Sequence, residues 1–291
     1  MATLREIRQR IGSVKTTQQI TKAMKMVAAA KMRRAQESIL AIRPYAREIN
    51  GLIHHIAASD DDNAIENPLM KAGSNDSILL VVVTADRGLC GAFNSNIIRH
   101  TEKLFREYSE HANVQLYTIG RKATEYFTKR EYPVMKNMTG IFNGLRFEHA
   151  VEISRDVVSQ FRAGSFGRVE FVYNEFKSAI QQNLRAELFL PFVSEEPDEQ
   201  TVHDYTEYIY EPDKQSILDV LIPKHLNVQV WRILLESNAA EQGARMTAMD
   251  NATENAEEIK SKLTLFYNRA RQAAITTEIS EIVGGAEALK E

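Results

Sequence analysis

The stretch LREIRQRIGSVKTTQQITKAMKMVAAAKMRRAQESILAI, residues 4–42, decides the fold of this chain. Apolar and small residues recur in it every seven positions, and the repeat runs on to residue 57. The two columns of the repeat are Leu4, Ile11, Gln18, Lys25, Met32, Ile39, Ala46 and Ile53, and Ile7, Val14, Thr21, Ala28, Ala35, Ile42, Ile49 and Ile56. This spacing predicts one long helix with a continuous seam, opened by a capping box of Thr3 and Glu6 and kinked at Pro44.

A second repeat of the same kind occupies the C-terminal part of the chain. Its columns are Val228, Leu235, Gln242, Met249, Ala256, Leu263, Ala270 and Thr277, and Trp231, Asn238, Arg245, Ala252, Ile259, Phe266, Ala273 and Ser280. No proline follows Pro223, and Gly284-Gly285 favours a helix end, so we predict a helix from about Gln215 to these glycines. Because both helices belong to one chain, they predict an antiparallel two-stranded coiled coil. Its polar seam residues either set the register or face something outside the pair.

The period changes between the two repeats, where short apolar runs alternate with helical patterns. Strands are expected over residues 77–84, 113–120 and 168–176, helices up to about 108, over 121–130 and over 147–161, and an antiparallel edge strand over 184–192. This alternation predicts a mainly parallel α/β sheet with helices on its faces. Linkers are expected over residues 59–74 and 193–213. The predicted plan is a coiled-coil helix (1–58), an α/β domain (76–192), a linker (193–213) and a second coiled-coil helix (214–291).

The composition excludes several classes of protein. The 36 Lys and Arg against 39 Asp and Glu leave a net charge of −3, so no global excess points at nucleic acid or membrane. The single cysteine, Cys90, rules out an internal disulfide and a cysteine-based metal cluster, and it fits a reduced compartment. The longest apolar run, residues 78–83, has strand length, and the charged N-terminus lacks the apolar stretch of a signal peptide. We therefore expect a protein on the cytosolic side without a membrane span.

Two stretches contain residues that could form a ligand-binding, catalytic or metal site, and each has a simpler structural explanation. The turn Asp86–Gly91 follows the first strand, where open α/β sheets bind ligands, but its glycines form neither a dinucleotide fingerprint nor a phosphate cradle. We expect a tight turn with a helix cap, and Cys90 as a small buried residue rather than a nucleophile. His54 and His55 with Asp60–Asp62 make a poor metal site, because adjacent histidines point to different helix faces. We predict no catalytic residue, no cofactor and no metal.

The two ends of the chain differ in charge. Residues 1–50 hold 11 Lys or Arg against three Glu. A solvated helix face, nucleic-acid contact and contact with acidic protein partners remain open, although no aromatic residue before Tyr45 interleaves as nucleic-acid binding requires. Residues 273–288 carry only Glu278, Glu281 and Glu287 as charges. A helix end of this composition is either buried in a partner or frays.

Several long motifs resemble the gamma-subunit family of F-type ATP synthases. KTTQQITKAMKMVAAAKMRRAQ (15–36) is similar to the family's N-terminal signature, and ITTEISEIVGGAEA (275–288) to its C-terminal signature. Between them, RPY at 43, TADRGLCGAFN at 84, YNEFKSAIQQ at 173 and ARMTAMDNATENA at 244 are similar too. The resemblance spans essentially the whole chain in the right order.

The resemblance implies an architecture and a role. The family combines an antiparallel coil of the two termini with a Rossmann-like α/β domain. Its coil is the central rotor shaft inside the ring of alpha and beta subunits, and its base sits on the ring of c subunits beside the epsilon subunit. Proton flow turns the c ring, and the shaft drives the beta-subunit nucleotide sites through their conformations. The chain itself would carry out no bond chemistry. It would lie at the cytoplasmic face of a bacterial plasma membrane, which it would touch only through its partners.

The resemblance also implies roles for individual residues. Met24 matches the methionine of the family's TKAM motif, at the contact with a lever segment of beta, and Lys25 stands where some members carry an acid. Arg271 and Gln272 match the ARQ motif that meets a beta-subunit loop, with Thr276 nearby. The shaft's bearing section would be Ile275, Ile279, Ile282 and Val283. The cations expected to face acidic segments of beta are Arg8, Lys22, Lys25, Arg33 and Arg34.

Two other classes of function remain as alternatives. The α/β domain could be a nucleotide-binding enzyme with a coiled-coil interaction arm, which nucleotide binding by the isolated chain would reveal. The chain could also be an adaptor that dimerises through its heptad seam, which a monomeric isolated chain would exclude.

Overall fold

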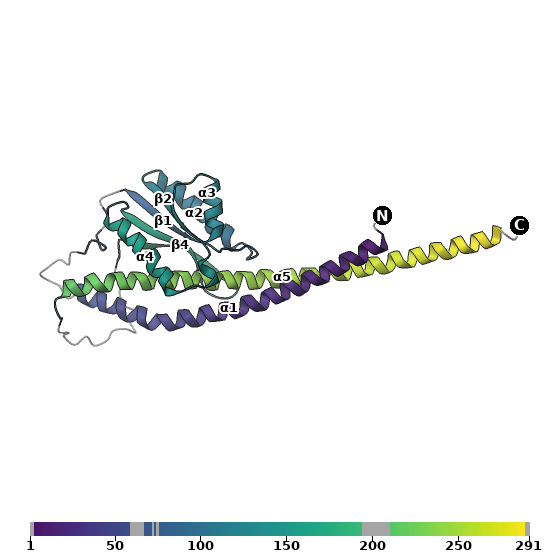
Figure 1. Cartoon of the computed structure of the whole chain (residues 1–291), viewed down its shortest axis with the longest axis horizontal. Helices are drawn as coiled ribbons and strands as arrows, with labels where there is room; N and C mark the ends of the chain where they lie inside the picture. The colour runs from purple at the N-terminus through teal and green to yellow at the C-terminus, as the bar shows by residue number, and fades with distance from the viewer. Residues whose placement is uncertain (1–2, 59–66, 72, 74–75, 194–209, 289–291) are drawn as a thin grey trace. The chain divides into compact units, whose positions relative to one another are not determined.

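The computed structural model describes residues 3–58, 67–71, 73, 76–193 and 210–288. By their internal contacts these residues belong to two compact units. We call residues 1–28 with 246–291 the coil unit, and residues 29–245 the domain unit. Two long helices, α1 (Leu4–Ala58) and α5 (Lys214–Ala288), each contribute to both units (Figure 1). The two long helices predicted from the heptad repeats are therefore confirmed.

Local sequence accounts for the start of α1 but not for the end of α5. The Thr3 backbone N–H donates to Glu6 Oε2 at 2.9 Å, and the Glu6 N–H donates to Thr3 Oγ1 at 3.3 Å, which is the predicted capping box. α1 then runs without interruption through Pro44. The helix end predicted at Gly284-Gly285 is wrong, because α5 continues to Ala288. Glycine in a helix costs only about 1 kcal/mol, which does not by itself end a helix.

The domain unit contains a five-stranded sheet in the order β3-β2-β1-β4-β5. Its strands are β1 (Ser77–Val83), β2 (Asn113–Ile119), β3 (Val134–Met138), β4 (Arg168–Phe176) and β5 (Gln182–Leu190). The helices between them are α2 (Phe93–Ser109), α3 (Arg121–Lys129), the 3-10 turn η1 (Ile141–Asn143) and α4 (Phe147–Arg162). The first four strands pair in parallel, and β5 pairs antiparallel to β4. The mainly parallel sheet with an antiparallel edge strand is confirmed.

One strand, β3, was not predicted. It has five residues, most of them half-buried, and it pairs only with β2 across a register shift. Its Lys136 forms an ion pair with Asp156 of α4 at 2.5 Å. A short edge strand that carries a cation and an amide lacks the apolar run by which a strand is recognised. The predicted edge strand over 184–192 is present but shifted, since β5 covers Gln182–Leu190.

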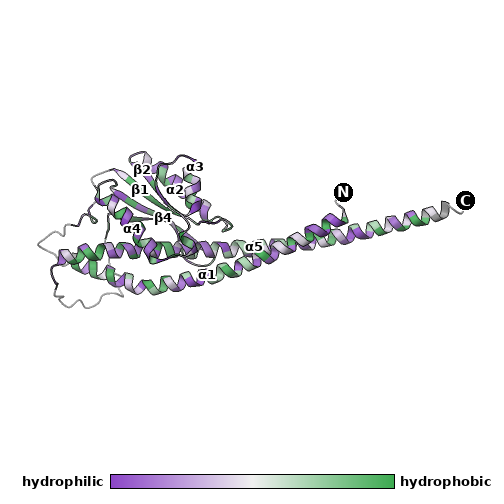
Figure 2. Cartoon of the chain, in the orientation of Figure 1, coloured by the Kyte–Doolittle hydropathy of each residue, from purple (hydrophilic) through white to green (hydrophobic). Residues whose placement is uncertain are grey.

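The core lies on both faces of the sheet. Leu79, Val81 and Val83 of β1 join a buried cluster with α4, the last turns of α1 and the first turns of α5, whereas Leu80 and Val82 join a second cluster with α2 and α3. β1 is therefore a doubly buried strand, as its unbroken apolar sequence predicts. Figure 2 shows hydrophobic residues alternating with polar ones along the first turns of α5, and Leu218, Ile222 and Leu226 are among those buried in the first cluster. They are a structural part of the α/β core.

The coil unit is an antiparallel helix pair with polar contacts across its seam. Thr21 Oγ1 and Thr253 Oγ1 lie 2.7 Å apart, and Gln18 donates to Glu257. The residue numbers rise on one helix as they fall on the other, which is the pairing of antiparallel strands of a coil. Every predicted seam position of α1 is buried or half-buried. The second column predicted in α5 fails at Ile259 and Phe266, whose exposed fractions are 48% and 56%.

Candidate partner-binding surfaces

The last turns of α5 leave the seam and have no neighbour among the residues of the coil unit that the structure describes. The pairing of Thr21 with Thr253 places the start of α1, Leu4, level with about residue 270 of α5. From Arg271 to Val283 every residue is exposed. The predicted bearing residues are among them, with exposed fractions of 47% for Ile275, 56% for Ile279, 68% for Ile282 and 56% for Val283. We call residues 271–283 the exposed tail.

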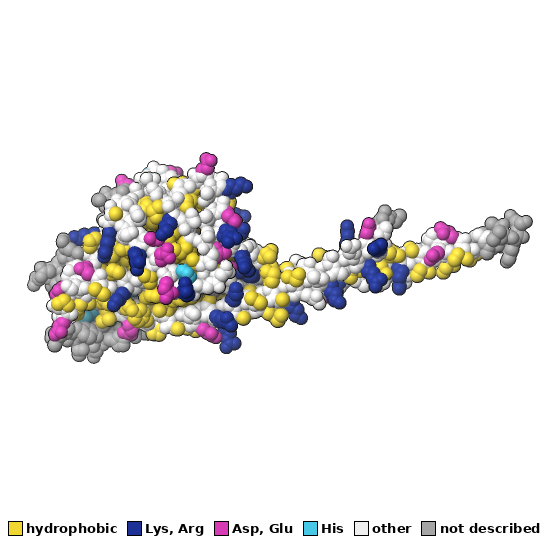
Figure 3. All heavy atoms as spheres, viewed as in Figure 1, with side chains coloured by type: hydrophobic (Ala, Val, Ile, Leu, Met, Phe, Trp, Pro, Cys, Tyr) yellow, Lys and Arg dark blue, Asp and Glu magenta, His cyan; other side chains and the backbone are white. Residues whose placement is uncertain are grey.

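The exposed tail combines apolar side chains with few charges (Figure 3). After Arg271 its only charged residues are Glu278 and Glu281. The Thr276 hydroxyl donates to the carbonyl of Gln272 at 3.0 Å, so its polar atom is satisfied within the helix. Contiguous exposed apolar surface on a soluble chain marks an interaction site. Arg271, Gln272 and Thr276 therefore lie where a partner that covers the tail would touch them.

The second predicted contact, Met24 with Lys25, lies in the coil unit. Met24 is half-buried. Lys25 Nζ lies 2.5 Å from Asp250 Oδ1, with exposed side-chain fractions of 40% and 43%. Lys25 therefore meets an acid of its own chain, and only part of its side chain is open to a partner.

The remaining predicted cations differ in how much of their charge is free. Arg33 pairs with Glu37 one helical turn away, at 3.1 Å. Arg8, Lys22 and Arg34 are exposed, and none has a carboxylate within 4.0 Å among the residues that the structure describes. An acidic partner would therefore form new ion pairs with these three cations more readily than with Lys25 or Arg33, which already have a carboxylate nearby.

The turn after β1 makes structural hydrogen bonds within the domain unit. Asp86 Oδ1 accepts backbone hydrogen bonds from Arg121 at 3.0 Å and from Gly140 at 2.8 Å, so it joins the ends of β2 and β3. The predicted tight turn is present, but the predicted cap is wrong. Ala92 occupies the N-cap of α2 and makes no side-chain bond, while Asn94 accepts from the Ala85 N–H at 3.0 Å.

Helix α5 occupies the carboxyl edge of the sheet, where α/β proteins bind ligands. The Arg245 guanidinium donates to the Gly88 carbonyl at 3.2 Å and pairs with Glu241 at 2.5 Å. The two side chains are only 11% and 6% exposed. Burial raises the pKa of Glu241, and Arg245 opposes that rise. The Gly88 carbonyl that would border a nucleotide therefore faces a guanidinium of the same chain.

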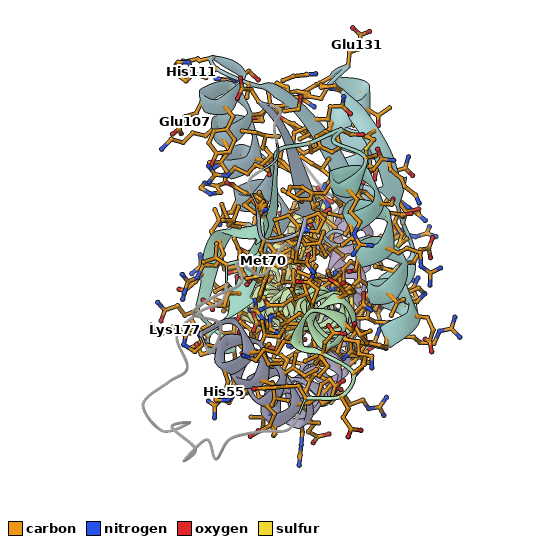
Figure 4. The ribbon with its side chains drawn as sticks, turned by 90° about the vertical axis from the view of Figure 1, so that its left-hand side faces the viewer. His55, Met70, Glu107, His111, Glu131 and Lys177 are labelled. Carbon is orange, nitrogen blue, oxygen red and sulfur yellow. The ribbon has the colours of Figure 1, made fainter. Side chains whose placement is uncertain are left out.

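The other two candidate chemical sites are Cys90 and the His54–His55 pair with Asp60–Asp62. Cys90 is 1% exposed, and burial raises the pKa of its thiol, which disfavours the reactive thiolate. His54 and His55 are half-buried near the end of α1, and Figure 4 labels His55 there. Asp60–Asp62 and most of the two predicted linkers lie outside the described residues. Among the residues that are described, no cluster of three metal-ligating side chains occurs.

Comparison with known proteins shows the family of this chain. A family model described as ATP synthase matches residues 3–289. An ATP synthase gamma chain of Prosthecochloris aestuarii is 50% identical over 295 residues, which cover 100% of this chain and 99% of the relative. That of Chlorobaculum tepidum is 49% identical over 296 residues and the full length of both. The chain belongs to the ATP synthase gamma-chain family. A gamma chain is a subunit of the synthase's central stalk and is not itself catalytic.

Solved structures agree with the fold. The chain is similar to a central-stalk chain of the Tetrahymena thermophila mitochondrial ATP synthase, with a TM-score of 0.60 and 26% identity, over 80% of this gamma chain and 99% of that chain. A chain of the Euglena gracilis mitochondrial ATP synthase matches with a TM-score of 0.67 and 20% identity, over 98% of this gamma chain and 94% of that chain.

One structural cluster of this gamma chain was missed by sequence reasoning. Arg232 of α5 donates to the Tyr173 hydroxyl at 3.2 Å, to Glu236 at 3.4 Å and also to Glu187. Tyr173 is on β4 and Glu187 on β5, so one guanidinium ties α5 to two strands. Arg232 is outside both heptad columns, and only the spatial meeting of three distant segments reveals its partners.

Among the residues that the structure describes, no helix is long and apolar enough to span a membrane.

Proposed function

We propose that this gamma chain is the rotor shaft of an F-type ATP synthase, transmitting rotation of a proton-driven c ring to the catalytic sites of the alpha/beta ring. Driven in reverse by ATP hydrolysis, the same shaft would turn the c ring. The observation that carries the proposal is the exposed tail, an apolar single helix that no other described residue of the coil unit covers. A tail of this kind needs a partner, and a partner that lets it turn must not hold it by fixed charges.

The bearing section of the shaft is formed by Ile275, Ile279, Ile282 and Val283. Spacings of three and four residues along a helix distribute these side chains over neighbouring turns. Apolar contacts have no preferred direction, so a tail that makes mainly such contacts can pass through all angles at similar energy. An ion pair would favour one angle over the others. The few charges of the tail after Arg271 support the bearing role.

Contacts with the beta subunits are assigned to two groups of residues. Arg271, Gln272 and Thr276 begin the exposed tail and would meet a beta-subunit loop. Met24 would touch the lever segment of beta, and Lys25 would act there together with Asp250, which already neutralises part of its charge. The exposed cations Arg8, Lys22, Arg33 and Arg34 would face acidic segments of beta, which makes the coupling sensitive to salt.

The base of the shaft would bind the c ring, with the epsilon subunit beside it. The chain would then lie at the cytoplasmic face of a bacterial plasma membrane and touch the membrane only through its partners. The match to a chain from a central stalk and c ring in Tetrahymena thermophila supports this arrangement. A nucleotide-binding role for the α/β domain is disfavoured, because Arg245 of α5 lies on the Gly88 carbonyl at the edge of the sheet.

Native mass spectrometry of the tagged chain, released gently from membranes, tests the proposal. We expect a complex with one copy of this chain and three copies each of two nucleotide-binding partners. Recovery of the chain as a homodimer, or alone with bound nucleotide, would sink the rotor proposal and favour the adaptor or the enzyme.

A further inference from the structure

A cleft of about 530 Å³ lies between helices α2 and α3, which cover one face of the sheet in the domain unit (Figure 1). We call it the α2–α3 cleft. Arg99 of α2 lines it, together with Lys122 and Lys129 of α3 and with Arg130 at the end of α3. Glu125 is its single acidic lining residue. Four cations against one carboxylate leave a charge of +3 in a cleft whose volume is within the roughly 300–1,000 Å³ of typical ligand sites.

Two of the four cations have no acidic partner. Arg99 and Lys129 are exposed, and neither has a carboxylate within 4.0 Å among the residues that the structure describes. Lys122 Nζ lies 3.1 Å from Glu125 Oε2, so the one acid of the cleft is already paired. An anion that enters the cleft therefore meets two free cations and displaces no existing ion pair.

The third and fourth sides of the cleft are held in place by neighbouring groups. The Tyr126 hydroxyl donates to Glu102 Oε1 at 3.0 Å, which fixes the ring. The guanidinium carbon of Arg130 lies 3.7 Å from the centroid of that ring, so this cation is held above it. Because Arg130 covers one face of Tyr126, a nucleobase finds no room to stack on that face. The cleft is therefore built for a negative charge rather than for an aromatic ring.

We propose that the α2–α3 cleft binds a small ligand that carries two phosphate groups. A phosphate group has a charge of about −1.5 to −2 at pH 7, so two of them match the charge of the cleft. Arg99 can bind one phosphate through two parallel hydrogen bonds, and Lys129 can bind the other as a point charge. The Asn94 amide and the Ser95 hydroxyl, which also line the cleft, already donate to groups of their own segment. Recognition therefore depends on the cations. The inference goes beyond the rotor proposal and does not depend on it.

Isothermal titration calorimetry of the purified full chain tests this binding, with inorganic pyrophosphate as the probe. The buffer contains no magnesium, which would bind the probe, and little salt, which would screen exposed charges. We expect saturable binding of one pyrophosphate per chain, and binding of inorganic phosphate weaker by about fivefold or more, because it can engage only one of the two free cations. ADP should bind no more tightly than pyrophosphate, since its base gains no stacking. A missing or unsaturable signal, equal affinity for phosphate, or tighter binding of ADP would each overturn the proposal.

Neutral substitutions then locate the site. Arg99→Gln should weaken pyrophosphate binding by about fivefold or more, and Lys129→Gln should do the same independently. Arg155→Gln is the matched control, because it removes an exposed arginine from α4, which packs on the opposite face of the sheet. We expect the control to bind like the wild type and all three variants to keep its unfolding midpoint in urea. Equal binding by Arg99→Gln and Arg155→Gln would overturn the assignment of the site to this cleft.

Cosedimentation with vesicles distinguishes a soluble ligand from a lipid headgroup, since both can present two phosphate groups. The vesicles are phosphatidylcholine with or without cardiolipin, whose headgroup carries two phosphates. Sedimentation with cardiolipin vesicles that pyrophosphate reverses and Arg99→Gln weakens would assign a lipid headgroup. Pyrophosphate binding in calorimetry without such sedimentation would assign a soluble ligand. None of these results bears on the rotor proposal, which native mass spectrometry of the complex tests separately.

Discussion

Replacing Arg232 by methionine tests whether a buried charge fastens α5 to the sheet. Arg232 is 24% exposed, and its partners Glu236 and Glu187 are 10% and 32% exposed. Removing one partner of a buried ion pair costs about 3–5 kcal/mol, mainly because the other charge loses its compensation. Since part of this cluster reaches solvent, we expect the lower end, about 3 kcal/mol of the free energy of unfolding. That is a large part of the roughly 5–15 kcal/mol that stabilises a domain.

Urea unfolding of the full chain, followed by circular dichroism, measures this loss. Arg185→Met is the matched control, since Arg185 pairs with Glu175 across the same two strands but is 56% exposed. We expect the control to change the unfolding midpoint little, because surface ion pairs contribute little to stability. A midpoint shift for Arg232→Met no larger than that for Arg185→Met would refute the argument.

The same variant carries a signature in pH. Burial raises the pKa of Glu236, and Arg232 lowers it. Without Arg232 this pKa rises further above its unfolded value, so the native state binds a proton more readily than the unfolded state. Stability then increases as the pH falls toward that pKa. The destabilisation by Arg232→Met should therefore be smaller at pH 5 than at pH 7, and a constant or growing difference would contradict an uncompensated carboxylate.

Three further changes have defined outcomes. Ile279→Asp in the exposed tail should change the unfolding free energy by less than about 0.5 kcal/mol, yet reduce ATP synthesis by the reassembled complex; loss of stability instead would show that the tail is packed. Gly120→Ala should lower the melting temperature, because φ is +92° and a Cβ would lie 2.0 Å from the Thr84 carbonyl oxygen, whereas Gly144→Ala, with open space at its Cβ, should not. Burial lowers the pKa of His225 from 6.5 to about 4, so the neutral ring contributes up to about 3 kcal/mol above pH 6.5 that is lost as the pH falls toward 4. His225→Gln should flatten this part of the stability–pH profile measured by urea unfolding.

The coil and most of the sheet can be predicted from the sequence, because heptad repeats and short apolar runs are local patterns. The seam residues Ile7, Ala28, Ile39 and Ile53 are buried as the heptad requires. β1 is buried on both faces, as its unbroken apolar run predicts. A heptad repeat shows which face of a helix can be buried, however, and not whether a second helix covers that face. The heptad in α5 continues past Ile259 although the side chain there is 48% exposed.

The features that escaped prediction depend on distant parts of the chain. β3 is a strand because β2 offers it an edge, and its own five residues contain no alternation strong enough to show this. The partners of Arg232 come from segments 45 and 59 positions away in the chain. A groove lined by Trp231, Lys31 and Arg34 likewise forms only where α1, η1 and α5 meet, so its cations were noted from the sequence while the tryptophan beside them was not. Local sequence patterns predict helices and strands. The side-chain clusters where these elements meet can be identified only once the fold is known.

The polar residues in the seam of the coil unit suit a shaft better than an apolar seam would. A seam of alanine and similar small side chains packs almost equally well after a slip of one heptad, because each layer resembles the next. Thr21 meets Thr253 at 2.7 Å, and Lys25 meets Asp250 at 2.5 Å, in successive layers. A slip of one heptad that separates both pairs would bring Thr253 toward Ala28 and Asp250 toward Met32, where their polar groups lose their partners at a cost in free energy. Of the two pairs, the Lys25–Asp250 ion pair stabilises the coil by little, since both of its side chains are partly exposed. Their effect is to make one register the lowest in energy, and a shaft that transmits torque must not slide between registers under load.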